Sequence, residues 1–170
     1  YWVKHSKTFA SCGLDLYYPS AGLSEFINLE IVNSLSFGEL AQSCLRSKKP
    51  GKVCGICWKC FRKNSMRGEE IVLSEEVKTF LSKKPLKQAA STLFAIQKLP
   101  LKDKQSILKM FPELEEYMDV NFTFLERYHP KSEMFVPEQY QSLYLNKLQA
   151  NFKEMTSEEV KQLESLNLFN

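Results

Sequence analysis

The spacing of apolar residues indicates a mainly helical chain that opens with one or two short strands. Residues 13–18 alternate between apolar and polar positions before Pro19, and this period of two predicts a strand. Residues 1–10 alternate more weakly and could contain a second short strand. Ser24 stands directly before apolar residues of helical spacing that continue to Val32, so it predicts a capped helix.

Helical spacing then continues to the end of the chain. Short helical segments are expected at residues 37–41 and 58–66. Longer helices are expected over residues 74–82, 86–99, 101–111, 113–118, 137–152 and 156–166. Thr156 and Glu159 have the spacing of a capping box. Aromatic residues recur at helical spacing through residues 122–144, and we expect them in the core rather than stacked on a ligand.

The length and composition indicate the size of the folded domain and the environment in which the protein works. With 170 residues, 44% of them hydrophobic, the chain can bury the core of one ordinary domain, or of a core with an appendage. No apolar run approaches the roughly twenty residues of a membrane-spanning helix or has the form of a signal peptide. We therefore expect a cytoplasmic protein with no membrane partner, whose thiols stay reduced. Cys12 stands apart from the other cysteines and is expected to be an ordinary buried thiol.

Positive charge is concentrated in one stretch, although the formal net charge is only +3. Residues 46–67 contain eight basic residues and no acidic one. Part of this excess can balance the thiolates of a metal site, and the rest can attract the phosphates of a nucleotide or nucleic acid. The candidate phosphate contacts are Lys48, Lys49, Lys52, Arg62 and Lys63. A solvated loop without any ligand explains the same pattern equally well.

A cluster of four cysteines is the clearest chemical signal in the sequence. Its members are Cys44, Cys54, Cys57 and Cys60. A Pro50-Gly51 pair lets the chain turn back toward the first cysteine, and Gly55 gives the later turn an unhindered backbone. Four thiolates complete the coordination of Zn²⁺ and leave no position for water, which predicts a structural rather than a catalytic zinc site. Disulfide bonds and an iron–sulfur cluster are the alternatives.

Residues 14–67 resemble a known family of enzymes. The segments that carry the resemblance are Leu16-Tyr17-Tyr18-Pro19, the helix over 23–32, Gln42-Ser43-Cys44 and Cys54-Gly55-Ile56-Cys57-Trp58-Lys59-Cys60. Together they are similar to the C-terminal half of 7-cyano-7-deazaguanine synthase and its relatives, which are PP-loop ATP pyrophosphatases. The resemblance implies that residues 1–68 are the zinc-bearing C-terminal part of an adenine nucleotide α-hydrolase-like α/β fold. Residues 69–170 would then form a helical extension.

Two departures limit the resemblance. The family's ATP-binding loop, of the Ser-Gly-Gly-x-Asp-Ser type, does not occur in these residues, and Lys63 stands where the family usually has an arginine. The sequence also begins with Tyr1 rather than Met. We therefore expect a PP-loop half outside this sequence, in the same chain or in another, and ATP and Mg²⁺ would bind there.

Two functions remain open at this point. In the first, the chain is the zinc-bearing part of an ATP-dependent enzyme that adenylates a deazapurine-like or carboxylate substrate. The helical extension would then select a protein partner or the purine-like substrate. The resemblance also allows a role for this enzyme in phage defence. In the second, the chain is a non-catalytic zinc module that binds nucleic acid or a protein. No Ser/His/Asp, Cys/His or paired-carboxylate arrangement indicates a catalytic residue.

Overall fold

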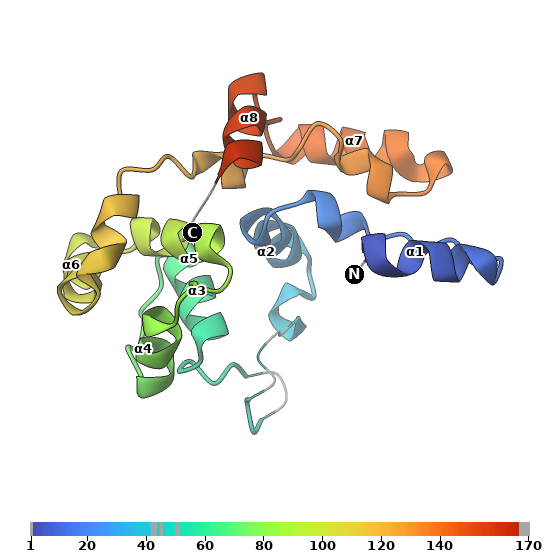
Figure 1. The fold of residues 1–170 in the computed structure, drawn as a ribbon. Helices are drawn as coiled ribbons and strands as arrows, with labels where there is room; N and C mark the ends of the chain where they lie inside the picture. Colours follow the sequence, from blue (N-terminus) through green and yellow to red (C-terminus); the bar gives the residue numbers. More distant parts are fainter. Residues whose placement is uncertain (1, 42–43, 45, 50–51, 167–170) are drawn as a thin grey trace.

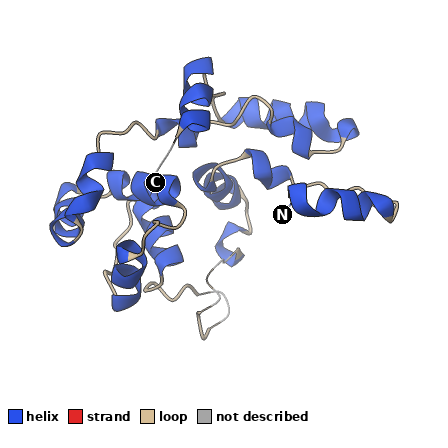
Figure 2. Cartoon of the chain, in the orientation of Figure 1, coloured by secondary structure: helices blue, strands red, loops and turns tan. Residues whose placement is uncertain are grey.

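The computed structural model describes residues 2–41, 44, 46–49 and 52–166, and this part of the chain is mainly helical (Figure 1, Figure 2). Its α-helices are α1 (Trp2–Ser11), α2 (Glu25–Ser34), α3 (Trp58–Arg67), α4 (Glu75–Ser82), α5 (Ala89–Lys98), α6 (Leu101–Met110), α7 (Glu138–Asn151) and α8 (Ser157–Ser165). Short 3-10 helices are η1 (Pro19–Gly22), η2 (Gly38–Leu40), η3 (Pro112–Tyr117), η4 (Thr123–Glu126) and η5 (Ser132–Phe135). Within the described ranges, the only β pairing is an isolated parallel bridge between Tyr128 and Glu154. The expected mainly helical class is confirmed.

The strand expected over residues 13–18 does not form. These residues have no regular secondary structure beyond the turn at their start, and Leu14 and Tyr18 are exposed. An alternating pattern becomes a stable strand only where other strands pair with it, and none lies beside this segment in the part of the chain that the structure describes. The amide of Tyr18 instead donates to the carbonyl oxygen of Phe135 at 3.1 Å.

The other expected strand, within residues 1–10, is a helix, because most of these residues belong to α1. Gly13 follows the helix with a φ of +71°, and the amide of Leu14 returns to the carbonyl oxygen of Phe9 at 3.0 Å. A left-handed glycine that closes a helix end is a stronger local signal than weak alternation. Cys12 lies at this end and is exposed, so the expectation of a buried thiol is wrong.

Helix α2 lies between two hydrophobic clusters and occupies the middle of the fold (Figure 1). Ser24 caps it as expected, because its Oγ accepts a hydrogen bond from the Ile27 amide at 3.0 Å. The same hydroxyl donates to the carbonyl oxygen of Leu125, which ties the start of α2 to η4. Ile27 packs in the smaller cluster with Leu148 of α7, whereas Leu29 belongs to the main core.

The main core joins α3, α4 and α5. Phe61 of α3, Val77 of α4 and Leu93 of α5 are almost completely buried. Helix α5 is covered on all sides, since residues 92–96 are buried without interruption. The core therefore contains residues from both sides of position 68. The division into residues 1–68 and 69–170 stays a prediction.

The helices expected in the second part of the chain are present, with differences in extent. Helix α5 begins later than expected, because Gln88, whose φ is +51°, interrupts the helical backbone. The helix expected over residues 113–118 is instead the 3-10 helix η3. The capping box of Thr156 and Glu159 is confirmed at the start of α8.

Most aromatic residues expected in the core lie there, and Phe122, Phe124 and Tyr128 are almost fully buried. Tyr140 is exposed, which corrects the expectation that it lies in the core. The reason is that α7 lies at the edge of the fold and packs through a narrow stripe of its surface (Figure 1). No helix in the described ranges has the length and apolar character needed to cross a membrane.

Candidate metal centre

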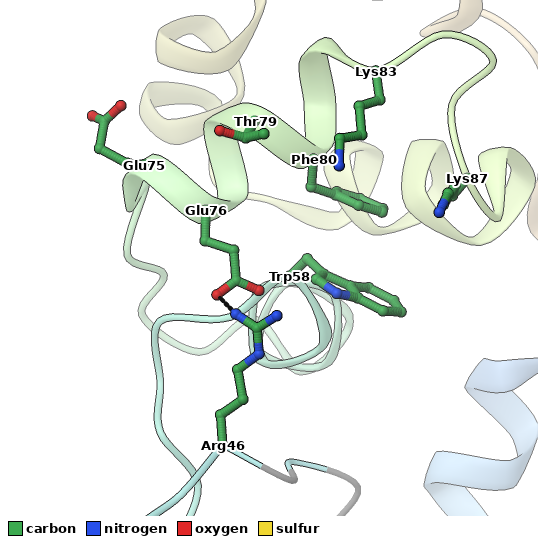
Figure 3. A pocket seen from close by; sticks show the side chains of 8 residues that line it. All are labelled: Arg46, Trp58, Glu75, Glu76, Thr79, Phe80, Lys83 and Lys87. Atoms are coloured by element: carbon green, nitrogen blue, oxygen red, sulfur yellow. Dashed lines mark hydrogen bonds and ion pairs between the residues drawn. The ribbon is translucent and has the colours of Figure 1, made fainter.

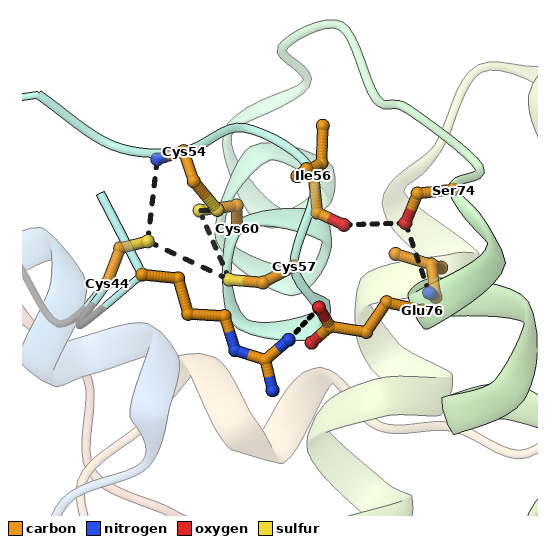
Figure 4. A network of polar contacts seen from close by, with 9 residues as sticks. Cys44, Cys54, Ile56, Cys57, Cys60, Ser74 and Glu76 are labelled. Atoms are coloured by element: carbon orange, nitrogen blue, oxygen red, sulfur yellow. Dashed lines mark hydrogen bonds and ion pairs between the residues drawn. The ribbon is translucent and has the colours of Figure 1, made fainter. Parts of the chain in front are cut away.

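The four cysteines of the predicted site lie together beside the first turn of α3 (Figure 4). Their Sγ atoms are all within 4.8 Å of one another. The distance is 3.9 Å from Cys44 to Cys57, 3.8 Å from Cys54 to Cys60 and 3.5 Å from Cys57 to Cys60. Disulfide bonds would require sulfur atoms about 2 Å apart, and these four cysteines are free.

These separations fit the coordination sphere of a single metal ion. With metal–sulfur bonds of about 2.3 Å, the corners of a regular tetrahedron of thiolates are about 3.8 Å apart. In a four-iron cluster each thiolate binds a different iron atom, which places the sulfurs farther apart than the ligands of one ion. The geometry therefore favours one ion over a cluster, and the four residues can hold it.

The local backbone explains why three of the thiols converge. Cys57 occupies the N-cap position of α3 and Cys60 lies in its first turn, so the two side chains share one side of the helix. Gly55 has a φ of +74°, which permits the sharp turn between Cys54 and the helix. The Cys-x-x-Cys-x-x-Cys spacing thus leads to the geometry that the sequence predicts.

The fourth thiol comes from the preceding loop. The amide of Cys54 donates to the Sγ atom of Cys44 at 3.4 Å, so the two ends of the loop meet at the site. Ser43 and the Pro50-Gly51 turn, which the sequence analysis assigns to this approach, lie outside the described residues.

Burial and hydrogen bonding set the acidity of the thiols. Burial raises the pKa of Cys57 above its usual 9.0, and burial together with the hydrogen bond to Cys57 raises the pKa of Cys60 to about 12. Burial also acts on Cys44, but hydrogen bonds from the backbone of Cys54 and Arg46 outweigh it and lower its pKa to about 6. Without a cation, at least two of the thiols therefore keep their protons at neutral pH.

The start of α4 contacts the cysteine loop at two points (Figure 4). The Ser74 hydroxyl donates to the carbonyl oxygen of Ile56 at 2.6 Å and accepts from the amide of Val77 at 3.2 Å. Glu76 forms an ion pair with Arg46, close to the first cysteine. The sequence signals Ser74 as a helix cap, but contacts between such distant positions leave no local pattern, so sequence reasoning missed both partners.

An aromatic contact also fixes α4 to the first turn of α3 (Figure 3). The indole of Trp58 stacks on the ring of Phe80, with 5.0 Å between centroids and 11° between planes. Together with Glu76, Lys83 and Lys87, the two rings line a pocket of about 470 Å³ beside the cysteines. The stacking holds the helix turn that carries two of the four thiols.

The five predicted phosphate contacts do not form one group. Lys48, Lys49 and Lys52 are exposed on the loop between the first two cysteines. Lys63 is half-buried on α3, where burial lowers its pKa and Glu25 partly opposes this effect.

Arg62, the fifth predicted contact, is buried and held by protein groups. It is 2% exposed, and its Nη2 atom lies 2.9 Å from the Oε1 atom of Glu25. It also donates to Gln88 and lies over the ring of Trp58, 4.7 Å from the centroid. Its side of α3 faces α2 and α5, so protein groups already occupy the guanidinium, and a phosphate contact by Arg62 stays a prediction.

Comparison with known proteins identifies a family but no characterised relative. No curated protein and no solved structure matches the chain. A family described as "Family of unknown function (DUF6395)" matches residues 4–167. The match covers almost the whole sequence, so the chain belongs to this family of unknown function.

Proposed function

We propose that the four cysteines bind one structural Zn²⁺ ion. The observation that carries this proposal is the set of sulfur separations, because they match the edges of a tetrahedron of thiolates around a single ion. Two of the thiols lie on the rigid first turn of α3, and the loop that supplies the others is tied to α4. The ion has no open coordination position, so it stabilises the loop and does not act on a substrate.

We further propose that this zinc-bearing chain acts as part of an ATP-dependent PP-loop enzyme resembling 7-cyano-7-deazaguanine synthase. The support is the order of a Ser24-capped helix, the four cysteines and the Gly55 turn, which follows the order in that family. In such an enzyme a substrate carboxylate oxygen attacks the α-phosphate of ATP and pyrophosphate leaves. A nitrogen nucleophile then displaces AMP from the adenylated substrate, which would be a deazapurine-like molecule or another carboxylate.

ATP–pyrophosphate exchange by the complete gene product tests this second proposal. We expect exchange of labelled pyrophosphate into ATP that depends on a carboxylate substrate and on a PP-loop half supplied by the same chain or by a partner. Failure of exchange with 7-carboxy-7-deazaguanine and with a panel of other carboxylates would count against the enzyme and leave the zinc site intact. Metal analysis by mass spectrometry under native and acidic conditions tests the zinc site separately, through the loss of one zinc on acidification.

A second candidate function is a non-catalytic module in which zinc supports a binding loop for nucleic acid. The observation that favours it is the exposure of Lys48, Lys49 and Lys52. In the described part of the chain, no carboxylate lies within 4.0 Å of their ammonium groups. Three exposed ammonium groups on one loop can attract a phosphate backbone without a specific pocket.

A further inference from the structure

A second pocket lies between α2, α3 and α5, away from the cysteines. Its volume is about 550 Å³, which lies in the usual range of roughly 300–1,000 Å³ for small-molecule sites. On α3 it is lined by residues 58, 59, 62 and 63, which share one face of the helix. Cys57 and Cys60 lie on another face, so the pocket and the metal centre use different sides of the same helix.

The pocket carries an excess of positive charge. Lys59, Arg62 and Lys63 line it, and among the described residues of its lining Glu25 alone is acidic. Glu25 pairs with Arg62 at 2.9 Å, which neutralises one positive charge. No carboxylate among the described residues lies within 4.0 Å of the ammonium group of Lys59 or of Lys63. The described lining thus keeps an excess of two positive charges, although Glu25 also acts electrostatically on Lys63 at longer range.

The remaining wall suits a small polar molecule. Ser91 of α5 lines the pocket with a hydroxyl that can donate a hydrogen bond, whereas the amide nitrogen of Asn28 already donates to backbone carbonyl oxygens, among them that of Ser24 at 2.9 Å. Trp58 forms an aromatic wall whose position is fixed by the Arg62 guanidinium on its ring and by its stacking on Phe80. Because Arg62 is itself held by Glu25, the pocket has a rigid charged wall before any ligand enters.

We propose that this pocket binds a small molecule of nucleotide size through a phosphate group, with Lys59 and Lys63 as the groups that contact the phosphate. The buried Arg62 is a positioning residue that holds the wall of the site in place. This inference goes beyond the proposed zinc centre, and it does not depend on the reaction proposed for the chain.

Calorimetric titration of the zinc-loaded protein tests the proposal, with pyrophosphate, AMP and adenosine as probes at constant ionic strength. We expect saturable one-to-one binding of pyrophosphate and AMP, and at least about tenfold weaker binding of adenosine, which lacks the phosphate. Lys63→Gln should weaken AMP binding about tenfold, the loss expected for one charge-assisted hydrogen bond. The control Lys102→Gln, which removes the same charge from the exposed start of α6, should change binding less than twofold.

Three outcomes would overturn the proposal. One is the absence of saturable binding of both phosphate-containing probes. The second is equal binding of AMP and adenosine. The third is unchanged AMP binding in Lys63→Gln. This result would mean that Lys63 does not contact the ligand and only offsets the negative charge of the thiolates on the same helix. If circular dichroism shows that Lys63→Gln does not fold, Lys59→Gln provides the same comparison at the second lysine of the pocket.

Discussion

At the scale of single residues, the cysteine site combines two opposite preferences. Burial favours neutral thiols, as the raised pKa values of Cys57 and Cys60 show, whereas a metal ion requires thiolates. The cation must displace protons that the folded protein holds more tightly than free cysteine does. The site is therefore sensitive to pH through its most buried members.

Zinc uptake should release at least two protons per ion at pH 7. The sign follows from the pKa values, because Cys57 and Cys60 titrate above pH 9.0 without metal and are protonated at pH 7. Zinc affinity should accordingly fall as the pH decreases, since protons compete with the metal for both sulfurs. Calorimetry in buffers of different ionisation enthalpy measures the number directly. A release of one proton or fewer would contradict four-thiolate coordination.

At the scale of elements, the cysteine loop and α4 behave as one unit, because a single hydroxyl forms hydrogen bonds with both. Ser74 caps α4 and also donates to Ile56, inside the cysteine sequence. The capping function is local and readable from the sequence, but the second contact is not. This dual role lets the effect of the cap be separated from the effect on the metal.

Ser74→Ala should destabilise the protein by about 1 kcal/mol, the usual cost of losing a helix cap, and should also speed zinc release. The reason for faster release is the loss of the hydrogen bond to the carbonyl oxygen of Ile56. Thermal unfolding and transfer of zinc to a coloured chelator measure the two effects. Thr156→Ala is the matched control, because it removes the cap of α8 and should leave the release rate unchanged.

The loop between the first two cysteines gives an independent prediction for nucleic-acid binding. Changing Lys48, Lys49 and Lys52 together to Glu should weaken binding to single-stranded oligonucleotides and flatten its salt dependence. The logarithmic slope should fall by about 2, since each contact to a single strand contributes about 0.7. The measurement is fluorescence anisotropy at several salt concentrations.

The matched control for this charge reversal is the same change at Lys102, Lys104 and Lys109 of α6. It alters the net charge equally and leaves the loop untouched. Equal losses in the two triple variants would mean that overall charge, and not the loop, governs binding. Unchanged binding in the loop variant would leave these lysines as solvated surface.

At the scale of the whole molecule, helix α3 connects the metal site to the main core, in addition to the contacts that α4 makes with the cysteine loop. Helix α3 carries Cys57 and Cys60 on one side and the buried Phe61 and Met66 next to them. Any loss of metal coordination thus reaches the packing of α3 against α5.

Cys57→Ser should lower the melting temperature by about 10 °C or more. Structural zinc contributes several kcal/mol to the free energy of unfolding, and each kcal/mol lost lowers the melting temperature by about 2–4 °C. Hydrogen exchange should lose protection over residues 52–67 and also in α4. Cys12→Ser is the control, since this thiol is exposed and outside the cluster. A Cys57→Ser variant that melts like the parent and retains zinc would disprove the ligand assignment.

Much of this fold was predictable because its signals are local. The caps at Ser24 and Thr156 and the cysteine spacing each lie within a few residues, and each is confirmed. The strand predicted over residues 13–18 failed because pairing is a long-range property that alternation alone does not supply.

The surroundings of the site were less predictable for the same reason. Arg62 and Glu25, which pair across two helices, are 37 residues apart in sequence, and nothing in either segment indicates the contact. The excess of basic residues was visible, but which of them are buried depends on how α3 meets α2 and α5. The charge composition thus located the positively charged stretch, but it did not show which of its basic residues are buried and which are exposed.

The two contacts of α4 with the cysteine loop set a limit on how this chain can be recombined. A graft that moved residues 1–68 onto another scaffold would leave behind Ser74 and Glu76, and with them the supports of Ile56 and Arg46. The smallest portable zinc unit therefore extends at least to the end of α4 at Ser82.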